Sequence, residues 1–148
     1  MKTKIYLDTS VISALFDERT PERLSMTSAF WSKLDDYEVF VSTLVLEELE
    51  RANVMVRDKM LSSVQSFNVL NISEKAVELA NCYLKQRIFP EKYFDDALHV
   101  ALASKNQIGI LVSWNFTHLV KLKTRRMVSI VNLQEDYMQI EIVSPPEL

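Results

Sequence analysis

The sequence predicts an α/β fold in which helices pack against a mainly parallel sheet, and three observations lead to that prediction. Short apolar runs with β-branched residues alternate with longer segments that have apolar residues at helical spacing. Residues that cap helices follow several of the short runs. The 148 residues are 48% apolar and 25% charged, which suits a globular chain long enough to bury a core. Strands that alternate with helices form parallel sheets, and we expect one domain over residues 1–148.

The first strand and the helix after it set the pattern for the chain. Residues 5–7 form a β-branched and aromatic run that is too short for a helix. Asp8 ends the run, and the hydroxyl groups of Thr9 and Ser10 are expected to cap a helix over residues 11–16. Asp8 therefore follows the carboxyl end of a strand, where open α/β sheets gather their functional groups. A role for Asp8 in capping the helix alone is the alternative interpretation.

The later segments repeat this alternation. The remaining strands are expected over residues 37–42, 69–72, 108–112 and 139–143. The remaining helices are expected over residues 21–34, 44–49, 56–67, 73–89, 92–103 and 124–133. Residues suited to helix starts stand at Pro21, Ser42, Ser73 and Thr124. Asp95 and Asp96 lie in the first turn of the alanine-rich helix over 92–103, where the helix dipole favours acids.

Composition excludes several kinds of site. Cys82 is the only cysteine, so neither an internal disulfide nor a metal site built from several thiolates can form. Gly109 is the only glycine, which excludes a phosphate-binding P-loop and a dinucleotide fingerprint. Two histidines are too few for a three-histidine zinc site. A catalytic metal would therefore be held mainly by carboxylates, which favour Mg²⁺ or Mn²⁺.

The net charge of −3 provides no overall positive field for nucleic acid. One local basic run, however, consists of Lys121, Lys123, Arg125 and Arg126. Its two interpretations are a phosphate-binding patch and a solvated helix face. No apolar run is long enough to span a bilayer and the start lacks a signal-peptide pattern, so we expect a cytoplasmic protein without membrane contact.

Polar side chains recur where predicted strands end and helices begin. They are Asp8, Glu47 or Glu48, Asp96 and Asn115. Each of them taken singly also fits a capping role, but together they should face one crevice at the carboxyl edge of the sheet. Several carboxylates in one crevice repel each other unless a divalent ion neutralises them. Metal-dependent phosphoryl hydrolysis uses such a set of carboxylates.

Four segments carry a family resemblance. They are YLDTS at 6–10, VS at 41–42 with EL at 48–49, DALHVALA at 96–103, and LVSWN at 111–115. In order and spacing they resemble the PIN-domain family, which includes the VapC-type toxins of toxin–antitoxin pairs. The resemblance implies a three-layer α/β/α sandwich, Mg²⁺- or Mn²⁺-dependent cleavage of RNA, a homodimer and inhibition by a small antitoxin.

The resemblance also assigns site residues. It makes metal ligands of Asp8, Glu48 and Asp96, and a fourth catalytic position of Asn115. Glu48 is preferred to Glu47 because it directly precedes the aliphatic residue Leu49. Many members have an aspartate where this chain has Asn115. The amide oxygen can still coordinate an ion but adds no charge, so a second ion should bind more weakly.

Further residues are secondary candidates. Ser10 is expected to bond Asp8 or substrate, or to cap the first helix. Asp95 would restore the missing charge, although neighbours on a helix point about 100° apart. His99 lies one turn after Asp96, where a packed histidine bonded to a neighbour is favoured over a ligand or proton-transfer role. His118 is open to the same two interpretations.

The resulting prediction is a metal-dependent endoribonuclease that acts as the toxin of a toxin–antitoxin pair. The first alternative is a non-catalytic or weakly catalytic PIN-fold module that binds RNA, because Asn115 weakens the site. The second is a carboxylate-metal phosphatase. It is the weakest of the three, because Ser10 stands where such an enzyme usually has a second aspartate.

Overall fold

The computed structural model describes residues 1–148 and is built around a five-stranded sheet in which every pairing is parallel. The strands are β1 (Thr3–Leu7), β2 (Tyr37–Ser42), β3 (Asn68–Leu70), β4 (Ile110–Val112) and β5 (Glu141–Val143). Their order across the sheet is β3-β2-β1-β4-β5. β1 is thus central, and its Ile5 pairs with Val39 on one side and Ile110 on the other.

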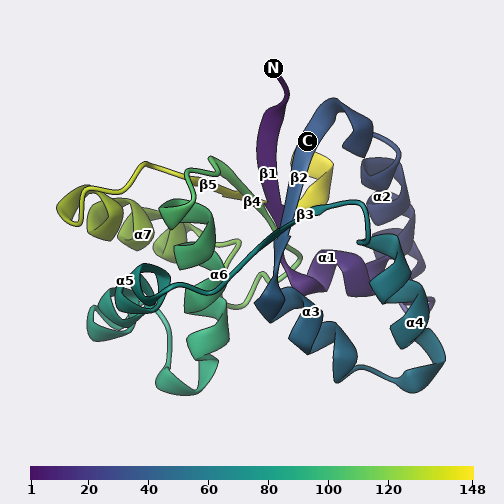
Figure 1. Ribbon diagram of the computed structural model, residues 1–148, viewed down its shortest axis with the longest axis horizontal. Coiled ribbons are helices and arrows are strands. Elements are labelled where there is room, and N and C mark those ends of the chain that lie inside the picture. The colour runs from purple at the N-terminus through teal and green to yellow at the C-terminus, as the bar shows by residue number, and fades with distance from the viewer.

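Helices cover both faces of the sheet. They are α1 (Thr9–Ala14), α2 (Pro21–Trp31), α3 (Thr43–Glu50), α4 (Val54–Ser63), α5 (Glu74–Lys85), α6 (Phe94–Lys105) and α7 (Leu122–Gln134). Three short 3₁₀ helices are η1 (Leu34–Asp36), η2 (Glu91–Tyr93) and η3 (Pro145–Glu147). Figure 1 shows α1 to α4 on one side of the strands and α5 to α7 on the other. The predicted α/β/α sandwich with a parallel sheet is confirmed.

The chain reverses its direction of travel across the sheet next to β1. From β1 it proceeds to β2 and β3 at one edge, and then crosses through α5 and α6 to β4 on the other side of β1. The carboxyl ends of β1 and β4 are therefore neighbours, and the Asp8 amide donates to the Val112 carbonyl (3.2 Å). Such a switch point is where open α/β sheets bind their ligands.

One continuous apolar core joins the layers. Ile5, Tyr6 and Leu7 of β1 are completely buried, as are Ala97 and Ala101 of α6. These alanines allow α6 to pack closely, since small side chains let a helix approach its neighbours. α6 packs against α5 and the sheet, which holds its first turn at the carboxyl edge. None of the seven helices is both long and apolar enough to cross a membrane.

The predicted caps were partly correct. The hydroxyls of Ser42 and Ser73 accept from the amides of Val45 and Ala76 (3.2 Å each) and so cap α3 and α5. Thr124 was predicted wrongly, because α7 begins two residues earlier, at Leu122.

The hydroxyls of Thr124, Thr9 and Ser10 make hydrogen bonds other than the predicted helix caps. The Thr124 hydroxyl donates to the His118 carbonyl (2.6 Å). Thr9 and Ser10 do not cap α1 either, because their hydroxyls donate to carboxylates. Local sequence identified these hydroxyl groups as hydrogen-bonding but not their acceptors, of which one, Glu48, comes from a distant segment.

Candidate active site

Asp8 is the most deeply buried acid at the carboxyl edge, with 4% of its surface exposed. Ser10 Oγ donates to its Oδ1 and Ser113 Oγ donates to its Oδ2, each at 2.5 Å. Asp8 occupies the N-cap position of α1, yet its side chain makes no capping hydrogen bond. The interpretation of Asp8 as a capping residue alone is therefore wrong. Its carboxylate is held by Ser10 of α1 and by Ser113, which follows β4, and it lies at the switch point.

Ser10 and Ser113 also fix the loop that follows β4. Ser10 Oγ accepts from the Trp114 amide (2.8 Å), and Ser113 Oγ accepts from the Asn115 amide (2.9 Å). Each hydroxyl thus donates a hydrogen bond to Asp8 and accepts one from a backbone N–H. Of the predicted roles for Ser10, the hydrogen bond to Asp8 is confirmed.

Glu48 points into the same edge from the second turn of α3, whereas Glu47 is exposed. Glu48 Oε1 accepts from the Thr9 hydroxyl and from His99 Nε2, both at 2.7 Å. The His99 ring is buried and its Nδ1 shares a hydrogen bond with the Tyr6 hydroxyl (2.7 Å). The preference for Glu48 over Glu47 therefore agrees with the direction of the two side chains.

The Tyr6 hydroxyl extends this chain of hydrogen bonds into α3. It also bonds Ser42 Oγ (2.8 Å), the residue that caps α3. Burial raises the Tyr6 pKa well above its usual value, so the phenol stays protonated. The helix that carries Glu48 is thereby tied to β1 at its start and to α6 through His99. The favoured interpretation of His99, a packed histidine bonded to a neighbour, is confirmed.

Asp96 lies in the first turn of α6 and accepts at Oδ2 from His118 Nδ1 (2.9 Å). The His118 ring packs against Tyr93, with centroids 4.1 Å apart and the ring planes tilted by 42°. Asp95 is half-buried but makes none of these contacts. Its direction differs from that of Asp96 because adjacent helical residues diverge by about 100°.

His99 is the common neighbour of the three acids. Burial raises the pKa of Asp8 and of Asp96, and in both cases the charge of His99 opposes the rise. Burial also opposes ionisation of Glu48, but the hydrogen bond and charge of His99, the Thr9 hydroxyl and the charge of Arg51 together outweigh it and leave the Glu48 pKa below its usual value. Burial lowers the His99 pKa less than Glu48, Asp8 and Asp96 raise it. The three carboxylates thus share His99 as a neighbour, and each of them raises its pKa.

Asn115 follows β4 but takes part in a turn. Its Oδ1 accepts from the backbone amide of His118 (2.9 Å), and its own backbone amide donates to Ser113 Oγ (2.9 Å). The nearer link from β4 to Asp8 is the Ser113 hydroxyl, which the sequence analysis did not select. The rule that selected Asn115, a polar side chain just after a strand, applies equally to Ser113. The catalytic role of Asn115 stays a prediction.

The donor set suits a hard cation by its chemistry, because it offers carboxylate oxygens and no thiolate. Glu48 Oε2 and Asp96 Oδ1 have no hydrogen-bond partner in the protein, since each histidine bonds only the other oxygen. No three His, Cys, Asp or Glu side chains, however, lie together closely enough to hold an ion. Ligation by Asp8, Glu48 and Asp96 therefore stays a prediction.

The predicted basic run is divided by the structure. Lys121 and Lys123 line a hollow of about 750 Å³ beside His118. Arg125 lies instead against the Ile142 carbonyl (Nη1–O 3.4 Å), and Arg126 is exposed outside the hollow. The four charges therefore do not act on one surface.

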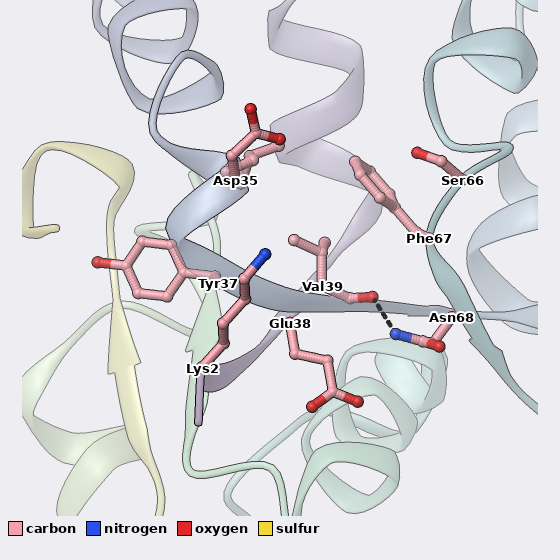
Figure 2. A pocket seen from close by; sticks show the side chains of 9 residues that line it. Lys2, Asp35, Tyr37, Glu38, Val39, Ser66, Phe67 and Asn68 are labelled. Carbon is pink, nitrogen blue, oxygen red and sulfur yellow. Dashed lines mark hydrogen bonds between the residues drawn. The ribbon is translucent and has the colours of Figure 1, made fainter.

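A second hollow, of about 400 Å³, lies at the opposite edge of the sheet. Figure 2 shows it beside the amino ends of β2 and β3, where Asn68 Nδ2 donates to the Val39 carbonyl (3.1 Å). Lys2, which precedes β1, is also among its lining residues. None of the candidate acids reaches this edge, so it is separate from the site.

The chain is similar to known proteins in sequence pattern and in fold. A sequence model of the PIN domain matches residues 5–115. No curated protein sequence matches the chain. Several solved structures are similar in fold, among them three VapC or VapBC structures.

The first is the Mycobacterium tuberculosis toxin VapC20, described as cleaving the sarcin–ricin loop, with 20% identity, 77% of this chain and 92% of that chain covered, and a TM-score of 0.62. VapBC2 of Rickettsia felis, bound to promoter DNA, is 12% identical, and the match covers 96% of this chain and 98% of that chain with a TM-score of 0.57. VapBC-1 of nontypeable Haemophilus influenzae is 20% identical, and the match covers 78% of this chain and 90% of that chain with a TM-score of 0.53. At these identities the likeness shows a shared fold.

Proposed function

This chain belongs to the PIN domain family, and from that premise we propose that it is a divalent-metal-dependent endoribonuclease, the toxin of a toxin–antitoxin pair. The observation that carries the proposal is that Asp8, Glu48 and Asp96 all lie at the carboxyl edge of the sheet, each with its carboxylate oriented by hydrogen bonds from neighbouring side chains. Partly or fully buried carboxylates repel each other unless a cation offsets them. The fold shared with VapC20, a toxin described as cleaving the sarcin–ricin loop, supports RNA as the substrate.

Asp8, Glu48 and Asp96 would hold the ion. Bound there, Mg²⁺ or Mn²⁺ supplies an activated water and offsets charge on the phosphate. The chain's own residues orient the carboxylates: the two serine hydroxyls hold both oxygens of Asp8, while Thr9 and His99 hold Glu48. Burial of Asp8 keeps water from competing for its oxygens.

Removal of divalent ions tests the proposal directly. We expect the purified protein to cleave single-stranded RNA with Mn²⁺ or Mg²⁺, to stop in EDTA, and to resume when Mn²⁺ is restored. The measurement is the initial cleavage rate, with the melting temperature recorded in EDTA as a control for folding. Cleavage that continues at the same rate in EDTA would show that the carboxylates do not act through a metal.

Partners form part of the same proposal. Two of the similar structures are VapBC assemblies, which supports a small antitoxin that binds and inhibits this chain. We also propose a homodimer, and one PIN-like domain over residues 1–148. Coexpression with a neighbouring small gene, followed by size-exclusion chromatography with light scattering, tests both partners.

Asn115→Asp is expected to increase cleavage at low Mg²⁺. The aspartate can still accept from the His118 amide, so the turn is retained while the site gains a negative charge. A second ion should then bind more tightly. The added charge should also lower the melting temperature of the metal-free protein. The measurement is cleavage rate against Mg²⁺ concentration, with Asn115→Ala as a control that removes the side-chain acceptor without adding charge. If Asn115→Asp alters neither curve, residue 115 lies outside the metal site.

A second candidate function is an RNA-binding module with little or no catalysis. Two observations favour it: no three candidate ligands lie close enough together to hold an ion, and Glu48 and Asp96 are each bonded to a histidine. This function predicts RNA binding that is the same with Mn²⁺ and with EDTA, and no cleavage in either. The ion-removal experiment therefore separates the two candidates.

A further inference from the structure

We propose that the hollow of about 750 Å³ beside His118 binds the phosphodiester backbone of single-stranded RNA next to the candidate active site; this rests on the proposed function and extends it. We call it the basic hollow. Its charged lining consists of Lys85, Arg87, Lys121 and Lys123, with Glu91 as the one acid. The hollow lies between the end of α5, η2 and the segment that enters α7.

The charge balance of the basic hollow is opposite to that of the whole chain. The protein has a net charge of −3, yet four cations and one carboxylate line this hollow. The ion pairs of the protein join Arg19 to Asp17, Arg57 to Asp58, and the two histidines to Glu48 and Asp96. The four cations of the hollow are therefore all free to bind an anion. A groove of free cations is how proteins follow a nucleic-acid backbone without reading its sequence.

The position of the hollow connects it to the candidate site. His118 is among its lining residues, and His118 Nδ1 donates to Asp96. The exposed Tyr93 ring packs against His118 at a tilt of 42°, with Lys92 Nζ 5.1 Å from the tyrosine centroid. An RNA strand held by the four cations would thus pass an aromatic pair and reach a proposed metal ligand. Bases stack readily on such rings in proteins that bind single strands.

Arg87 offers a way to remove one charge without harm to the fold. It follows α5 with φ 58°, a left-handed conformation that glycine adopts without strain and other residues adopt at a cost. Arg87→Gly should therefore keep or raise the melting temperature while it removes a cation. Gln107 follows α6 in the same conformation, with φ 59°, and lies outside the hollow. Gln107→Gly is the matched control.

The experiment measures the affinity of the full-length protein for a fluorescent single-stranded RNA in EDTA, over a series of salt concentrations. Each backbone phosphate contact contributes about 0.7 to the slope of log affinity against log salt. We expect the slope to fall by about 0.7 in Arg87→Gly and by about 1.4 in Lys121→Gln with Lys123→Gln, and the dissociation constant to rise several-fold. Gln107→Gly should match the wild type, as should Arg125→Gln with Arg126→Gln, which changes two cations outside the hollow.

The proposal is overturned if the hollow variants keep the wild-type slope, or if the Arg125 and Arg126 pair lowers it equally. It is also overturned if duplex DNA of the same length binds as tightly and loses affinity in the same variants, because the hollow would then be a general polyanion site. Binding is measured without metal, so a failure of the cleavage experiment leaves this result intact. The two proposals can therefore fail separately.

Discussion

Asp8→Asn is expected to reduce RNA cleavage about 100-fold or more. The substitution keeps the size of the side chain but removes the charge of the most buried candidate ligand, which is held by the hydroxyls of Ser10 and Ser113. Changes to residues that hydrogen-bond a metal ligand cost about 10- to 100-fold, so loss of a ligand should cost at least as much. The measurements are initial cleavage rate and Mn²⁺ affinity by calorimetry. Asp95→Asn is the matched control, because Asp95 lies beside Asp96 but contacts none of the site residues.

The same substitution should alter how stability depends on pH. Burial raises the Asp8 pKa in the folded protein. A carboxyl group with a raised folded-state pKa stabilises the fold below its unfolded pKa, and that contribution is lost as pH rises through the folded value. Without metal, the wild type should therefore lose stability between the acidic range and neutral pH more steeply than Asp8→Asn. Unchanged Mn²⁺ affinity together with a lower melting temperature at every pH would make Asp8 a purely structural residue.

His99→Leu is expected to have the second largest effect, with cleavage reduced about 10- to 100-fold. The change removes the hydrogen bonds from the buried ring to Glu48 and Tyr6, so Glu48 loses its orientation. It also removes the positive charge that offsets Asp8, Glu48 and Asp96. Loss of a buried, charge-assisted hydrogen-bonding group costs about 2 kcal/mol of unfolding free energy.

A response to metal separates the two consequences of His99→Leu. If the three carboxylates repel each other once the ring is gone, Mn²⁺ should raise the melting temperature of the variant more than that of the wild type. Tyr6→Phe is the milder control, because it removes the bond to His99 Nδ1 and leaves the His99–Glu48 pair in place. Cleavage at the wild-type rate in His99→Leu would mean that His99 only fills the core.

Site prediction succeeded where a residue's place follows from local pattern. Asp8 was located because an apolar strand ends at it, and the structure places it at the switch point. The expected helix caps show where local pattern stops being sufficient. A hydroxyl after a strand satisfies the rule for an N-cap, but Thr9 donates to Glu48, which α3 brings within reach, and Ser10 donates to Asp8. Thr124 likewise bonds a carbonyl from the preceding loop.

The sequence itself determined the alternation of strands and helices, the parallel sheet and the positions of the candidate acids. The spacing of apolar residues and the residues that end each strand or helix are local features, which a few neighbouring residues encode. Only the tertiary structure decided what each acid contacts. Tyr6 and His99 are 93 residues apart, and no local pattern relates them. The crossover from β3 to β4 brings residues 85–91 beside residues 117–123, which joins Lys85 and Arg87 to half of the predicted basic run and leaves the other half outside. Contacts of that kind depend on the path of the whole chain across the sheet.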